Sequence, residues 1–106
     1  MTHTDNQKTV LEFMLREGEA INGGGSLEYM LGDNMCLTFA SSIAEHTGKS
    51  RQAVGGIISG LIKRGLVYRG MKRTKRNHDD ATFAGQWELW LTDEGVRQAF
   101  ALREAH

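Results

Sequence analysis

The sequence has little of three features that would assign it to other protein classes. One cysteine in 106 residues rules out an internal disulfide. No apolar run approaches the roughly eighteen residues of a membrane-spanning helix, and residues 1–5 lack the basic and apolar character of a secretory signal. We therefore expect a cytoplasmic protein that has no membrane partner.

The overall composition is that of a globular protein. Hydrophobic residues make up 40% of the chain and charged residues 25%, and the length suffices for one hydrophobic core. We expect a single domain over residues 1–106. Cys36 lies in the apolar run Met35–Leu37, and we expect a buried structural thiol there in preference to a reactive one.

Acidic residues are missing from one stretch of the chain. Nine of the 13 Lys and Arg residues lie between Lys49 and Arg76, and none of the 13 acids does, although the net charge of the whole chain is zero. Such an asymmetry is typical of a phosphate-binding surface. The alternative is a basic face that only keeps the protein in solution.

The segment GKSRQAVGGIISGLIKRG, residues 48–65, predicts an amphipathic helix over residues 50–64. Ser50 is a favourable N-cap and Gly65 a stop, and five apolar residues recur at helical spacing: Val54, Ile57, Ile58, Leu61 and Ile62. The opposite face carries small, polar or cationic residues and no carboxylate. It consists of Arg51, Gln52, Gly55, Gly56 and Ser59. We interpret this helix as one that closely approaches an anionic partner.

Other patterns predict the remaining elements. A capping box at Thr4 and Gln7 begins a helix over residues 5–17, and a glycine-rich loop over residues 18–36 contains one turn capped by Ser26. Thr38 is expected to cap a short helix that ends near Gly48. A turn this tight before the next helix is the sequence form of a helix-turn-helix. Strands at 66–69 and 86–91 then flank a polar hairpin loop, 70–85, and a last helix begins at Thr92.

The stretch from Leu37 to Phe100 resembles the winged helix-turn-helix domain of MarR-like bacterial transcriptional regulators. The matching residues are Leu37, Thr38, Ile43, Ala44, Gly48, Val54, Ile58, Leu61, Gly65, Leu66, Val67, Arg69, Leu91, Thr92, Asp93, Glu94 and Gly95. The resemblance implies an α+β fold, mainly helical, with a core over 37–100 and a two- or three-stranded antiparallel wing over 66–91. It also implies a repressor that binds double-stranded DNA, with helix 50–64 in the major groove and loop 70–85 on the minor groove or backbone.

Each candidate residue has an expected role on DNA. In a major groove, Arg51 could bond to guanine and Gln52 to adenine, next to Ser50 and Ser59. Phosphates suit Lys49, Lys63, Arg64 and Arg69, and a minor groove suits Lys72, Arg73, Lys75 and Arg76. Gly55 and Gly56 each cost a helix about 1 kcal/mol relative to Ala. Either these glycines let the helix backbone come close to DNA or to a neighbouring helix, or they have no such role and burial of the apolar stripe holds the helix together.

Apolar residues near the end of the chain allow two interpretations. Trp87 alternates with Leu89 and Leu91 and is expected in the core, which leaves Trp90 partly exposed for a DNA or protein contact. Val96, Phe100 and Leu102 on the last helix either form a homodimer seam, as terminal helices often do in such regulators, or cover the core.

Nothing in the sequence predicts an enzyme, a metal site or a cofactor. The histidines at 3, 46, 78 and 106 lack ligand spacing, and His78, Asp79 and Asp80 are expected to moderate the charge of the hairpin loop. Two other functions stay open. One is a winged-helix module that binds a protein, as an adaptor or a phage-type inhibitor of a host factor. The other is non-specific binding of duplex or RNA.

Overall fold

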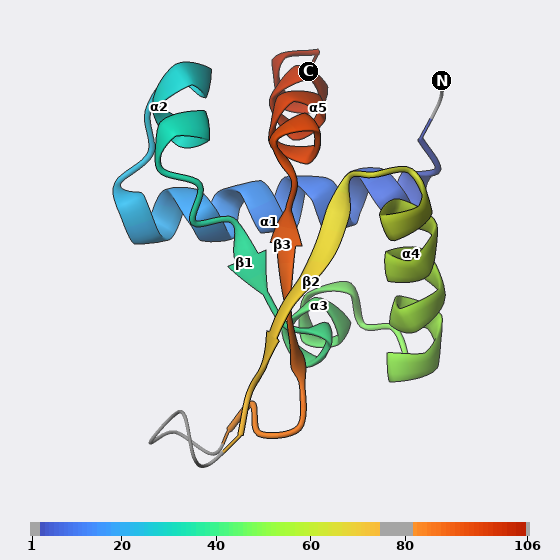
Figure 1. Cartoon of the computed structure of the whole chain (residues 1–106). Helices are drawn as coiled ribbons and strands as arrows, with labels where there is room; N and C mark the ends of the chain where they lie inside the picture. The colour runs from blue at the N-terminus through green and yellow to red at the C-terminus, as the bar shows by residue number, and fades with distance from the viewer. Residues whose placement is uncertain (1–2, 75–81, 106) are drawn as a thin grey trace.

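A computed structural model describes residues 3–74 and 82–105 (Figure 1). In this part of the chain, five helices surround a three-stranded antiparallel sheet of order β1-β3-β2. The elements, in chain order, are α1 (Asp5–Asn22), α2 (Leu27–Gly32), β1 (Leu37–Thr38), α3 (Ala40–Thr47), α4 (Arg51–Lys63), β2 (Val67–Lys72), β3 (Trp87–Leu91) and α5 (Asp93–Glu104).

Helix α1 begins where the sequence predicts but is longer than expected. Thr4 and Gln7 form both bonds of the capping box, as predicted. The helix continues through Gly18, where the absence of a side chain makes room for Cys36. A Cβ on Gly18 would clash with the Cys36 sulfur. The stop is Gly23, whose φ of 85° is left-handed.

The predicted loop over residues 18–36 is therefore wrong in part. Residues 18–22 belong to α1, and the single turn expected after Ser26 is the helix α2. Ser26 caps it, since its hydroxyl accepts a bond from the backbone of Tyr29. Met30 carries this short element into the core, where it is fully buried.

Thr38 does not cap the next helix. It lies in β1 opposite Leu89, and its buried hydroxyl has no hydrogen-bond partner among the described residues. Helix α3 starts after Phe39, which provides no side-chain cap. A distant residue instead satisfies a backbone N–H in the first turn of α3: the Gln86 side chain accepts a hydrogen bond from the backbone N–H of Ser41 at 3.2 Å.

Helix α4 is confirmed closely. Ser50 caps it by accepting a bond from the backbone of Ala53, and Gly65 takes a φ of 74° just after its end. Of the predicted stripe, Val54, Ile58 and Leu61 are buried, whereas Ile57 and Ile62 are half-buried and pack against the core.

Strands β2 and β3 form the wing, the hairpin that extends from one end of the molecule (Figure 1). Strand β2 runs to Lys72, so Gly70 belongs to the strand and not to the predicted loop. Gly70 fits because the Trp90 indole lies over it: a Cβ would sit 2.6 Å from Nε1. The pairing is irregular between Arg69 and Lys72, where the register shifts.

The start of β2 and the start of α5 interlock. Thr92 caps α5, as predicted, and its hydroxyl also donates to the carbonyl of Gly65 at 2.7 Å. The backbone N–H of Thr92 donates to the carbonyl of Leu66, and Gly95 packs on that same oxygen at a distance that leaves no room for a Cβ. These contacts give a physical reason why the segments GLVYR (residues 65–69) and LTDEG (residues 91–95) occur in the same chain.

The core lies between α1, α5, α4 and the sheet, and it includes Cys36, which is fully buried. Val96 and Phe100 face this core, so they cover it rather than leaving a free seam. The helix-turn-helix of α3 and α4, followed by the wing, makes the fold a winged helix-turn-helix of the α+β class, as predicted.

Candidate nucleic-acid interface

Two lines of residues run along the part of α4 that the core leaves uncovered. Gln52, Gly56, Ser59 and Lys63 follow one another at helical spacing and are all exposed; we call them the outer line. Arg51 and Gly55 are exposed on a second line, which Ile58 continues into the core. The second line faces the wing, because its three residues line a pocket there.

The two glycines of α4 have empty space around them. A Cβ on Gly55 or on Gly56 would meet nothing within 4 Å. No helix in the described part of the chain approaches them, which removes that reason for their presence. Two explanations of the glycines remain. Either they allow an outside partner to approach the helix closely, or the helix is stable enough to contain them without a function.

The wing is fixed to the start of α3 by side chains from both elements. Besides accepting from the backbone of Ser41, Gln86 donates to the Ser41 hydroxyl at 3.0 Å. The rings of Phe39 and Phe83 stack with centroids 4.1 Å apart. The segment just before β3 is thereby held against the start of α3.

The Glu88 carboxylate accepts hydrogen bonds from three donors on one side of the wing. It accepts from Arg73 Nε at 3.0 Å, from the backbone N–H of Met71 and from the Trp90 indole. The Arg73 guanidinium also lies 5.2 Å from the centre of the Phe39 ring. Arg73 thus helps to fix the wing, in addition to the DNA role that the sequence predicts for it.

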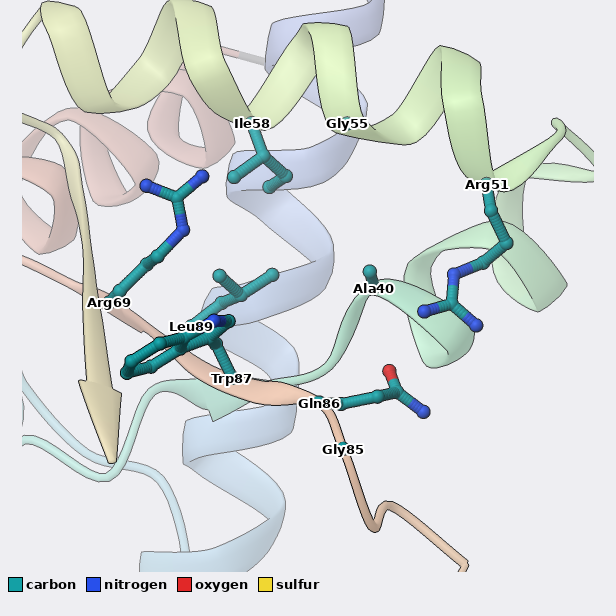
Figure 2. Close-up of a pocket in the computed structure, with 9 residues that line it drawn as sticks. All are labelled: Ala40, Arg51, Gly55, Ile58, Arg69, Gly85, Gln86, Trp87 and Leu89. Carbon is teal, nitrogen blue, oxygen red and sulfur yellow. The ribbon is translucent and has the colours of Figure 1, made fainter. Parts of the chain in front are cut away.

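An open pocket of about 210 Å³ lies between α4 and the wing (Figure 2). The Arg51 side chain descends from the start of α4, and the Arg69 side chain rises toward α4 from β2. In this view Trp87 and Leu89 of β3 lie below Arg69 and Gln86 lies below Arg51, so the two guanidinium groups are at opposite ends of the pocket. No carboxylate lines this pocket, and a cation lies at each end of it.

Trp87 is not in the core, contrary to expectation. Its side chain is 46% exposed, whereas Leu89 and Leu91 on the same face are buried. Trp87 is the first residue of β3 and pairs with Lys72, beyond the point where the core ends. Its ring lines the pocket, with Lys72 Nζ 5.9 Å from the ring centre. Trp90, expected to be partly exposed, is half-buried.

The predicted cations differ in their partners. Lys49, Lys63 and Arg69 are exposed, as is Ser50 at the start of α4. Arg64 is half-buried and turns toward α1, where its guanidinium bonds to Gln7 Oε1 at 2.8 Å and to His3 Nδ1 at 2.6 Å. Burial, followed by the charge of Arg64, lowers the pKa of His3.

Several predicted wing residues lie outside the described residues. They are Lys75, Arg76, His78, Asp79 and Asp80. Their roles stay predictions.

Three further observations concern the described ranges 3–74 and 82–105. These residues contain no cluster of three potential metal ligands, and none of their helices is long and apolar enough to cross a membrane. Burial, with a smaller contribution from Glu19, raises the pKa of the Cys36 thiol to about 11. This thiol is therefore protonated near neutral pH and is a poor nucleophile.

Sequence reasoning missed the residues that fix the wing: Phe39, Phe83, Gln86 and Glu88. Each acts across a long separation in sequence, so no local spacing marks it. The one available signal is Glu88, a lone acid within the strand WELWL, next to a segment rich in cations.

Comparisons with known proteins agree with the fold. No family model matches the chain, and no curated protein matches it. The solved structure of disulfide-formed AbfR is 23% identical, with a TM-score of 0.51 over 90% of this chain and 62% of that chain. The structure of reduced AbfR bound to DNA is 22% identical, with a TM-score of 0.50 over 87% of this chain and 63% of that one. This chain thus spans less than two thirds of the length of these neighbours, and the likeness is one of fold.

Proposed function

We propose that this protein is a DNA-binding transcriptional regulator of the MarR-like kind, a repressor that acts by occupying a specific site on double-stranded DNA. The observation that carries the proposal is the pocket between α4 and the wing, which both Arg51 and Arg69 line and which no carboxylate lines. Cations of the helix and of the wing therefore face the same side. A duplex lying on that side would contact both elements at once.

Helix α4 suits the major groove. Its outer line offers an amide at Gln52, a hydroxyl at Ser59 and a cation at Lys63, with Gly56 between them. Amide and hydroxyl groups read base edges, and Gln pairs well with adenine. The absent side chain at Gly56 would let the helix backbone come close to the bases.

The remaining predicted cations suit the DNA backbone and the minor groove. Lys49 is exposed at the start of α4, where the helix dipole also favours a phosphate. Lys72 lies on the wing, which Gln86 and Glu88 hold in place. We assign phosphate contacts to Lys49, Lys63 and Arg69, and minor-groove contacts to the wing loop that carries Lys75 and Arg76.

We also propose a homodimer, formed at the end of the molecule away from the wing. Helices α2 and α5 lie at that end (Figure 1). Large exposed side chains nearby in the chain are Ile21 in the last turn of α1 and Tyr29 in α2, 54% and 47% accessible. A dimer built there would leave both wings and both α4 helices free to bind a two-fold symmetric site. Sedimentation equilibrium of the wild-type protein and of Ile21→Glu measures this directly.

The test of the proposed function is selection of duplexes from a random library, followed by footprinting of the selected sequence. We expect one enriched sequence and a footprint that covers adjacent major and minor grooves. Gln52→Ala should lower discrimination at one base pair by about 1–3 kcal/mol. No enrichment over random duplex, with the protein folded, would refute specific binding and leave non-specific or protein binding.

A further inference from the structure

We propose that Arg73 does not contact DNA and is a positioning residue instead, which together with Glu88 fixes the wing against Phe39 at the start of α3. This inference rests on the proposed function and assigns roles within the same surface. It replaces the minor-groove contact that the sequence suggests for Arg73. It also gives a role to Glu88, an acid that lies in a hairpin expected to bind an anion.

The first support is the side of the wing on which Arg73 is held. Side chains alternate between the two faces of a strand, so Trp87 and Leu89 share one face of β3 and Glu88 lies on the other. Trp87 and Leu89 line the pocket beside α4 (Figure 2). Glu88 therefore faces away from that pocket, and so does the Arg73 guanidinium, whose Nε lies 3.0 Å from Glu88 Oε2. A duplex that contacts α4 and the wing together would approach the opposite face.

The second support is the environment of the ion pair. The side chains of Arg73 and Glu88 are only 24% and 12% exposed, whereas both members of the Glu94–Arg97 pair on α5 are more than half exposed. The Arg73 guanidinium also lies over the Phe39 ring, 5.2 Å from its centre. Charges that are partly shielded from water interact more strongly than exposed ones. The Glu88 charge thus offsets the attraction between Arg73 and a phosphate.

The third support is the set of elements that Arg73 connects. Its backbone N–H donates to the carbonyl of Gln86 at 2.8 Å, and its carbonyl accepts from the N–H of Gly85 at 2.8 Å. The Gln86 side chain in turn bonds to Ser41 in the first turn of α3. The Arg73 side chain reaches Phe39, two residues before Ser41. Both sides of the hairpin are therefore tied to residues 39–41.

A wing that is fixed in the free protein binds at a lower entropic cost. A segment that is loose before binding loses conformational freedom when it is ordered at an interface, and this loss lowers affinity. Helix α3 leads into α4 through the short turn 48–50, so a wing tied to the start of α3 is placed relative to α4. Arg73 and Glu88 would therefore raise affinity for a duplex that contacts both elements, without contacting it themselves.

The test depends on one isosteric substitution, Glu88→Gln. Glu88 Oε2 binds Arg73, whereas Oε1 accepts from the backbone N–H of Met71 and from the Trp90 indole, each at 3.2 Å. Glutamine keeps one acceptor oxygen for those two donors and presents an amide NH2 group to the guanidinium, to which it cannot bond. The variant therefore removes the contact with Arg73 and keeps the other two. Thermal denaturation should show that it is folded.

The measurement is the affinity for the duplex selected by the wild type, at fixed salt. The wild type is compared with Glu88→Gln, Arg73→Gln and the double variant. Glu94→Gln is the matched control, because it also removes the carboxylate of an ion pair, but in α5. Both Glu→Gln variants gain one unit of positive charge, so electrostatic attraction alone would leave their affinity unchanged or raise it.

The proposal expects the opposite sign for Glu88→Gln. This variant should weaken binding by about 3- to 30-fold, Arg73→Gln by about the same factor, and the double variant by no more than either, because all three remove one contact. If Arg73→Gln weakens binding and Glu88→Gln leaves it unchanged or strengthens it, Arg73 contacts DNA and the proposal is overturned. Additive losses in the double variant, or no loss in any variant, would overturn it as well.

Hydroxyl-radical footprinting of the same duplex separates positioning from a general loss of structure. In Glu88→Gln, protection by the wing should fade, while protection by α4 and discrimination at the base pair read by Gln52 should stay as in the wild type. Equal loss at both grooves would contradict the positioning role. Wild-type binding with an unaltered Glu88→Gln variant would refute that role alone, whereas absence of wild-type binding to any duplex would refute the proposed function and the role together.

Discussion

Replacing Gly56 with alanine should strengthen the fold and weaken DNA binding, two effects that are seldom found together. A Cβ at this position meets nothing within 4 Å, so the methyl group causes no clash in the free protein. Glycine inside an exposed helix costs about 1 kcal/mol relative to alanine. For a domain of this size, that gain corresponds to an increase of about 4–8 °C in Tm.

On DNA the same methyl group should do harm. Gly56 lies on the outer line of α4, between Gln52 and Ser59, where the helix backbone would come closest to the bases. Filling a closely packed contact with an extra methyl group costs about 1–3 kcal/mol. Affinity for the selected duplex should therefore fall by about 5- to 150-fold.

The assay pairs thermal denaturation, followed by circular dichroism, with fluorescence anisotropy of a labelled duplex at fixed salt. Gly32→Ala in α2 is the matched control, because a Cβ there also meets nothing within 4 Å and α2 lies away from α4 (Figure 1). Because α2 lies at the proposed dimer end, sedimentation equilibrium must first show that this variant has the oligomeric state of the wild type. It should be stable and bind DNA like the wild type. If Gly56→Ala raises Tm and leaves affinity unchanged, the glycine does not serve close approach, and this part of the reasoning fails.

Three further predictions concern the fold and its titratable groups. Gly95→Ala should lower the free energy of unfolding by about 3 kcal/mol, because the new Cβ would clash with the backbone oxygen of Leu66. Urea denaturation measures this loss, and a loss below about 1 kcal/mol would contradict the contact. Cys36, buried and with its pKa raised to about 11, should react with a thiol reagent only as fast as the protein unfolds, and rapid labelling of the native protein at pH 7 would be the contrary result. The pKa of His3 is lowered below 6.5 by burial and by Arg64, so the unfolded chain takes up the proton first, and the free energy of unfolding should fall as the pH drops below about 6.5. His3→Gln should flatten that pH dependence, and an unchanged profile would count against the contact.

The elements whose signals are local could be predicted from the sequence. Thr4, Ser26, Ser50 and Thr92 each bond to a backbone N–H three residues ahead, so the sequence around them suffices to predict a helix start. The helix-turn-helix and the wing followed from the spacing of such starts and stops.

The wrong predictions concern residues whose role is decided by distant partners. Gly18 looks like a helix stop, but Cys36 packs on it within the helix. Thr38 looks like a cap, but pairing with Leu89 places it in a strand. Alternation assigns Trp87 to the inner face of β3, yet it cannot tell where along the strand the core ends.

The candidate site divides in the same way. The acid-free face of α4 is visible in the sequence, because it depends on helical spacing alone. The pairing of Arg64 with Gln7, and the presence of both Arg51 and Arg69 in the lining of one pocket, depend on how α1, α4 and β2 pack. These contacts decide which cations have no partner in the described structure, and the sequence does not contain that information in local form.

The most direct test of the central claim is the affinity of the wild-type protein for duplex DNA, measured as salt rises from about 50 to 200 mM. With about five phosphates neutralised per chain by the cations of α4 and the wing, log K should fall against log salt with a slope near −4 to −5. An affinity that does not change with salt would contradict the account, because the cations of α4 and the wing would then not be the groups that hold the duplex.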